Sequence, residues 1–220
     1  MTIVRTEHKT CAVCDVSSPV RVWLSYSSFE KMGPSLDGCQ PGAPNADLVQ
    51  FCRHCGYASY EITEVPQCPG IIKTKFYRDV LKHRWIDDSC KGYLCLTFFL
   101  VADDDYKGAF WSSLRAAWVC DADDYWQGSE EYRLQALEMM RRSHEAGIAV
   151  SESQEQDHLL QTDLLRRTGS FQQAMSIVME ALKGCREQKM GRLLRFERRL
   201  IENGDKAVHW VKEAEGVAWA

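Results

Sequence analysis

Two cysteine pairs with identical spacing carry the clearest chemistry in the sequence. Cys11 and Cys14 form one C-x-x-C motif, Cys52 and Cys55 form a second, and 37 residues separate the two. Zn²⁺ takes four thiolates in a tetrahedron, and a C-x-x-C turn brings two sulfurs to one side of a metal. Together the motifs predict one zinc ion held by these four cysteines.

The residues around the two pairs favour tight turns flanked by strands. Gly56 follows the second pair and Asp15 holds the equivalent place after the first, and both residue types tolerate the positive φ that a metal-binding knuckle needs. Apolar residues alternate with other types over Pro19 to Tyr26, which predicts a strand. The expected structure is a zinc ribbon.

Other uses of the cysteines stay open at this point. The same four ligands suit iron or an iron–sulfur cluster, a C-x-x-C can be a redox pair, and the thiols can be metal-free. Cys39 and Cys68 stand alone in loop sequence, and either could replace a ligand. His54 lies between two ligands and is expected on the surface. The remaining cysteines, expected to be buried apolar fillers, are Cys90, Cys95, Cys120 and Cys185.

The chain changes character near residue 70. All six prolines precede that point, and Lys31 to Asn45 is a Gly- and Pro-rich loop, whereas the later sequence has helical periodicity. We therefore expect an α+β protein with a zinc-ribbon domain at 1–70 and a mostly α-helical domain at 71–220. The predicted helices are 71–84, 89–102, 106–122, 129–146, 154–168, 171–184, 189–203 and 205–215.

One pair of these helices is similar to a tetratricopeptide repeat. In Leu164 to Leu182 the matching residues are Leu165, Gly169, Phe171, Ala174, Val178 and Ala181. A weaker second copy runs from Ala116–Cys120 into Leu134–Met140, with Ala136 placed 38 residues before Ala174. The helical domain is thus a short tetratricopeptide-like array or, alternatively, an irregular bundle with one such hairpin.

Composition narrows the classes of function. The chain has 220 residues and a net charge of −4. Within 1–70 there are five Lys and Arg residues and seven Asp and Glu residues. Because this balance does not attract phosphate, a zinc-ribbon nucleic-acid binder is the less favoured alternative.

The longest apolar run, Tyr93 to Ala102, is too short to cross a membrane. The N-terminal residues lack the apolar stretch of a signal peptide, so we expect a cytoplasmic protein with reduced thiols.

Charge is also uneven within the helical part. Residues 103–131 hold eight acidic and two basic side chains, while 183–199 hold seven basic and two acidic ones. The basic helix around Arg192 is either a solvated face or a contact for an acidic surface, on a partner protein or on a second copy of the chain.

Several of these features resemble a bacterial family catalogued as domain of unknown function 2225. The shared segments are C-A-V-C, N-A-D-L-V-Q-F-C-R-H-C-G-Y-A-S, R-A-A-W-V and D-L-L-R-R-T-G-S-F-Q-Q-A. The resemblance implies a four-cysteine metal ribbon, with ligands Cys11, Cys14, Cys52 and Cys55, joined to tetratricopeptide-like helices. The chain departs from the family at Ala12 and Arg53, where proline is usual, and in the insertion around Cys39.

The sequence thus predicts a non-enzymatic zinc-binding protein whose helical hairpins bind another protein. No nucleophile elbow, phosphate-binding loop or H-E-x-x-H motif is present, and four sulfur ligands leave no open position on a metal. An enzyme with a site assembled from scattered residues is the remaining alternative.

Overall fold

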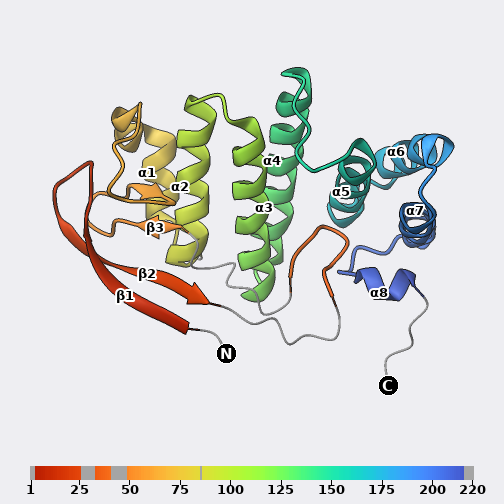
Figure 1. Ribbon diagram of the computed structural model, residues 1–220, viewed down its shortest axis with the longest axis horizontal. Helices are drawn as coiled ribbons and strands as arrows, with labels where there is room; N and C mark the ends of the chain where they lie inside the picture. The colour runs from red at the N-terminus through yellow and green to blue at the C-terminus, as the bar shows by residue number, and fades with distance from the viewer. Residues whose placement is uncertain (1–2, 26–32, 41–48, 85, 216–220) are drawn as a thin grey trace. The chain divides into compact units, whose positions relative to one another are not determined.

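The computed structural model describes the chain except residues 1–2, 26–32, 41–48, 85 and 216–220 (Figure 1). Two small antiparallel sheets precede a series of helices, which confirms the α+β class. Contacts divide the chain into two compact units, residues 1–27 with 44–143 and residues 28–43 with 144–220. The predicted division into a zinc-ribbon domain at 1–70 and a helical domain at 71–220 stays a prediction.

The first unit begins with two β-hairpins, and the turn of each hairpin contains one cysteine motif. Strands β1 (Ile3–Thr10) and β2 (Ser17–Ser25) pair from Ile3↔Ser25 to Thr10↔Ser17. Strands β3 (Gln50–Phe51) and β4 (Ala58–Ser59) form the shorter second pair. The predicted strand is therefore present up to Ser25, and Tyr26 lies outside the described residues.

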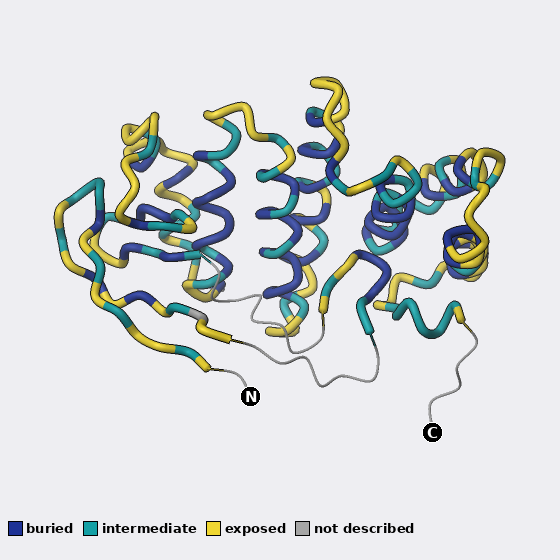
Figure 2. Tube along the Cα trace, in the orientation of Figure 1, coloured by how far each residue is buried: buried dark blue, intermediate teal, exposed yellow. Residues whose placement is uncertain are grey.

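Helices complete the first unit. A 3-10 turn, η2 (Pro69–Lys73), leads into α1 (Lys75–Lys82), which is followed by α2 (Asp88–Ala102), α3 (Tyr106–Ala122) and α4 (Trp126–Glu145). The predicted helix 71–84 is broken at Thr74, because the extended backbone there lets its hydroxyl accept the Tyr77 amide and start α1. Helices α2 and α3 present their buried residues toward each other (Figure 2).

The second unit packs three helices, α5 (Gln154–Arg167), α6 (Phe171–Gly184) and α7 (Gln188–Glu202), with the short α8 (Val211–Ala214). The predicted helix at 205–215 is wrong over most of its length. Arg166 Nη1 donates to the carbonyl oxygens of Asp205 and Ala207 at 2.8 and 2.9 Å, which keeps this stretch out of a helical turn.

Part of the predicted loop at 31–45 belongs to this second unit. Within the described residues 33–40, Leu36 N donates to His209 O at 2.9 Å, and Val211 N donates to Pro34 O at 3.0 Å. Asp37 is fully buried and lies 2.9 Å from Arg167. Backbone pairing and a buried ion pair therefore hold this loop against residues more than 120 positions away.

Helices α2, α3, α5 and α7 end in the same turn. In each, the second residue after the helix adopts positive φ: Asp104 and Asp124 (56° and 55°), Gly169 (76°) and Gly204 (64°). The residue that follows donates its amide to a carbonyl five positions back, as Ser170 does to Leu165 and Asp105 to Leu100. The predicted helices 154–168 and 189–203 end directly before Gly169 and Gly204, whereas aspartate in this role at the other two turns was not predicted.

These turns allow the hairpin α3–α4 to be aligned residue by residue with the hairpin α5–α6. Asp124 and Gly169 hold the same place, so Ser129 corresponds to Ala174 and Ala136 to Ala181, all of them buried. This alignment makes Ala136 equivalent to Ala181, whereas the sequence comparison aligned Ala136 with Ala174. Small side chains at both places let the second helix of each hairpin pack closely.

No described helix is long and apolar enough to cross a membrane. The apolar stretch at Tyr93 to Ala102 forms most of α2, and its side chains are largely buried in the first unit.

Asp157 is a buried carboxylate that organises the approach to α5. It accepts the amides of Val150 and Ser151 at 3.1 and 2.8 Å and the Ser151 hydroxyl, and it lies 2.7 Å from His144 Nε2. Burial raises the pKa of Asp157, but these hydrogen bonds lower it by more than burial raises it, so the pKa lies below its ordinary value.

We predict that Asp157→Asn lowers the free energy of unfolding by about 1–3 kcal/mol at pH 7, because buried donors lose an ionised acceptor. The contribution is complete above pH ~4 and is lost as the pH falls through the native-state pKa. Urea unfolding across this range, with the exposed neighbour Glu152→Gln as control, measures the difference. An equal deficit at pH 3 and pH 7 would contradict this role for the carboxylate.

Candidate metal centre

The two cysteine motifs fold into turns with the same hydrogen bonds. Cys11 N donates to Val16 O at 3.1 Å and Asp15 N to Cys11 O at 2.9 Å; in the second motif Cys52 N donates to Tyr57 O at 2.8 Å and Gly56 N to Cys52 O at 2.7 Å. The φ angles of Asp15 and Gly56 are 56° and 86°, as the sequence predicts. Each turn places two sulfurs on its inner side.

The turns bring four thiols into one group. Their Sγ atoms all lie within 4.8 Å of one another. Cys11 and Cys55 Sγ are 3.7 Å apart, as are Cys14 and Cys52 Sγ. A tetrahedron with metal–sulfur bonds of ~2.3 Å has edges of about 3.8 Å, so these distances suit a metal ion and are far too long for disulfides. The group could hold a metal ion with cysteine ligands alone.

The surroundings shift the pKa values of the thiols in different directions. Burial raises the pKa of Cys52, but hydrogen bonds from the amides of Cys55 and His54 and from the Ser18 hydroxyl lower it by more. The resulting pKa is about 7, below the ordinary value of a thiol. Burial raises the pKa of Cys11, and burial with the neighbouring thiols raises that of Cys55. Four thiolates this close repel one another, so a bound cation would favour the fully ionised group.

The loop that contains Glu61 and Ile62 contacts the first turn, and helix α1 contacts the second. Ala12 N donates to Ile62 O at 3.0 Å, and Lys9 Nζ forms an ion pair with Glu61 at 2.5 Å. On the second turn, Tyr77 of α1 donates its hydroxyl to Gly56 O at 2.6 Å. These contacts hold both motifs in place from sequence-distant residues, and the sequence gives no signal of them.

The thiol group packs directly on the core of the first unit. Cys11 and Cys52 are fully buried and belong to one apolar cluster with residues of the turns and of α1 and α2. Tyr57 and Tyr77 contact Phe99 of α2 edge to face at 5.1 and 5.8 Å between ring centroids. The core beneath the site therefore extends beyond residue 70.

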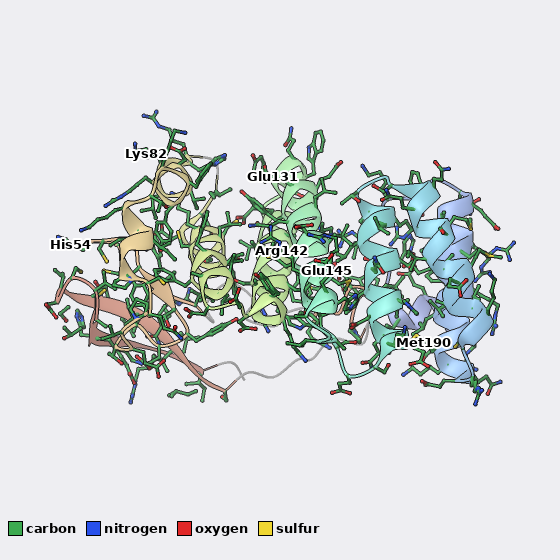
Figure 3. The ribbon with its side chains drawn as sticks, turned by 90° about the horizontal axis from the view of Figure 1, so that it is seen from above. His54, Lys82, Glu131, Arg142, Glu145 and Met190 are labelled. Carbon is green, nitrogen blue, oxygen red and sulfur yellow. The ribbon has the colours of Figure 1, made fainter. Side chains whose placement is uncertain are left out.

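The other candidate ligands lie elsewhere. Among the described residues, the only metal-capable group contains neither Cys39 nor Cys68. Cys39 closes a turn of the second unit by donating its amide to Ser35 Oγ at 2.9 Å, and Cys68 is exposed before η2. His54 is exposed at the tip of its turn (Figure 3).

The remaining cysteines are mostly buried in helices, as predicted. Cys90, Cys95 and Cys120 are buried, and the Sγ atoms of Cys90 and Cys120 lie 3.5 Å apart between α2 and α3, a proximity that the sequence does not signal. Cys185 follows α6 at its end and is only partly buried, so the prediction that it is a buried filler is wrong.

Comparison of the chain with family models, with curated proteins and with solved structures gave no match. The resemblance to the domain of unknown function 2225 family therefore stays a prediction that rests on the segments quoted above.

We predict that Gly56→Ala weakens both the fold and the metal site. A Cβ there would lie 2.5 Å from Leu81 Cδ1, in a backbone region that side chains avoid. The expected loss is about 1–3 kcal/mol of unfolding free energy. Asp15→Gly at the matching place should cost less than 1 kcal/mol, since glycine accepts the same φ. Thermal unfolding with metal analysis measures both, and equal effects would contradict the argument.

Proposed function

We propose that the chain is a non-enzymatic zinc-binding protein that acts as a protein-protein interaction module. The observation that carries the proposal is the group of four thiols, with Sγ atoms within 4.8 Å of one another on two matching turns. The ligands are Cys11, Cys14, Cys52 and Cys55.

The donor set favours zinc in a structural role. Four thiolates complete the coordination of Zn²⁺, so no position remains for water or substrate. Iron takes the same ligands, but a tetrathiolate iron site absorbs visible light and a zinc site does not. The proposed surroundings are a reducing compartment such as the cytoplasm, because the ligands must remain free thiols.

The interaction role is supported by the helical hairpins of the second unit. Helices α5 and α6 join through the glycine turn at 169, with Ala174 and Val178 fully buried and Ala181 nearly so. This is the packing that a tetratricopeptide-like hairpin requires, and stacked hairpins of this type present surfaces to other proteins. The proposal retains membership of the domain of unknown function 2225 family.

The basic helix is α7, and its charge lies on one exposed face. Arg192, Arg195 and Arg199 follow at helical spacing and are exposed, opposite the buried Leu194 and Ile201. Arg199 lies over the Phe196 ring at 5.5 Å. Among the described side chains, neither Arg192 nor Arg195 has an ion-pair partner. An acidic protein surface is the matching partner.

The acidic segment at 103–131 does not form one patch that could match α7 in a second copy. Asp103–Asp105 lie at the start of α3 and Asp121–Asp124 at its end, about 25 Å apart along a 17-residue helix. Several of these carboxylates are already engaged, as Asp105 is with Gly108 N and Asp121 with Arg133. We therefore favour a different protein as the partner.

We predict one zinc per chain in the purified protein, and loss of most of it in Cys52→Ser, because three thiolates and a hydroxyl hold zinc far less tightly. Elemental analysis measures the content, and Cys68→Ser, an exposed cysteine outside the group, is the control. A well-folded metal-free protein, or full zinc in Cys52→Ser, would refute the site. Visible absorption would identify iron instead.

We predict that Arg192→Glu with Arg195→Glu slows association with a partner recovered from the native host by roughly 10-fold at low salt and flattens its salt dependence. Lys73→Glu with Arg78→Glu, exposed on the first unit, is the charge-matched control. Surface plasmon resonance across salt concentrations measures both variants.

Nucleic acid should bind the unmodified protein no more tightly than about 10⁻⁴ to 10⁻⁶ M near physiological salt. A sub-micromolar, sequence-dependent complex that the α7 double variant weakens would overturn the protein-interaction assignment in favour of the nucleic-acid alternative.

A further inference from the structure

A groove lies on the first unit between α1 and α4, with α2 as its floor, and encloses about 440 Å³. We name it the α1–α4 groove. Its volume is in the range of sites that accept a ligand or a few side chains. All its walls belong to the first unit, which also holds the thiol group.

One wall is a continuous face of α1. Phe76, Asp79 and Val80 line the groove at positions i, i+3 and i+4 of α1, and His83, directly after the helix, continues this wall. Phe76 is 71% exposed, which is unusual for a phenylalanine on a helix that also contacts a core. His83 Nδ1 is buried without a hydrogen-bond partner among the described atoms.

The floor and the second wall differ in polarity. Leu94 and Phe98 of α2 give an apolar floor, whereas Glu131 and Gln135 of α4 give a polar rim (Figure 3 labels Glu131 on α4). Within the described part of the chain, neither Glu131 nor Gln135 has a side-chain partner. An apolar floor with polar side chains at its edge is typical of a binding groove.

Charge selects the kind of occupant. Asp79 and Glu131 stand on opposite walls, and the described residues that line the groove include no lysine or arginine. Asp79 also pairs with Lys75 at 2.9 Å, but both side chains are largely exposed, so this pair is weak. The groove therefore favours positive charge at its edges and apolar side chains on its floor.

We propose that the α1–α4 groove binds an amphipathic helical segment of a partner protein, with leucine-type side chains on the floor and Lys or Arg beside Asp79 and Glu131. The groove face of α1 from Phe76 to Val80 and His83 extends for about 10 Å, which matches two turns of a helix. This inference rests on the proposed interaction role and adds a second surface, opposite in charge to that of α7.

The test uses the full zinc-loaded chain and three 14-residue helical peptides. The first is an alanine-based peptide with leucine at i, i+4 and i+7 and lysine on both flanks; the second replaces lysine by glutamate, and the third replaces leucine by alanine. Fluorescence anisotropy measures binding. We expect the leucine–lysine peptide to bind at least 10-fold more tightly than either of the others.

Two pairs of variants locate the binding. Glu131→Lys should weaken it roughly 3- to 10-fold, while Glu64→Lys, the same charge change at an exposed residue outside the groove, should have little effect. Phe76→Ala should weaken it about 5-fold or more, with the equally exposed Val65→Ala as control. All four substitutions are on exposed side chains, and the zinc content verifies that the unit is intact.

Three outcomes would overturn the proposal: no binding of the leucine–lysine peptide up to about 1 mM, equal binding of the glutamate peptide, or equal effects of each variant and its control. None of them bears on the zinc content or on association through α7, so failure of the groove is distinguishable from failure of the proposed function.

Discussion

The meeting of two cysteine turns is the constraint on which the first unit depends. Each turn needs a residue at positive φ, and each buries a cysteine, Cys11 or Cys52, in the same apolar cluster as α1 and α2. Four thiols in so small a volume are unfavourable as anions without a cation and costly to desolvate. A tetrahedral metal ion would remove that cost and join β1–β2 to β3–β4, whose own strands are too few to form a stable sheet.

That constraint reaches the helices through a small number of contacts. Tyr77 donates to Gly56 O and packs on Phe99, so the start of α1 and the last turn of α2 are fixed to the second turn. The same α1 carries Phe76 and Val80 on its groove side. The metal site and the α1–α4 groove are therefore mechanically linked: loss of metal would loosen the helix that forms one wall of the groove.

Sequence reasoning succeeded where the signal is local. The four thiols and the positive φ at Asp15 and Gly56 follow from spacing and residue type, and most of the helices follow from local periodicity. It failed where distant groups decide the conformation. Arg166 holds the carbonyls of Asp205 and Ala207 and so excludes the helix predicted there, and residues 33–40 pair with the chain near Trp210. No periodicity or composition carries such long-range information.

X-ray absorption at the zinc edge of the purified protein tests the central claim most directly, because it reports the ligands and not only the metal content. We expect zinc with four sulfur neighbours at about 2.3 Å and no nitrogen or oxygen in the first coordination shell. A shell that contains nitrogen or oxygen, or fewer than four sulfurs, would contradict a site built from Cys11, Cys14, Cys52 and Cys55.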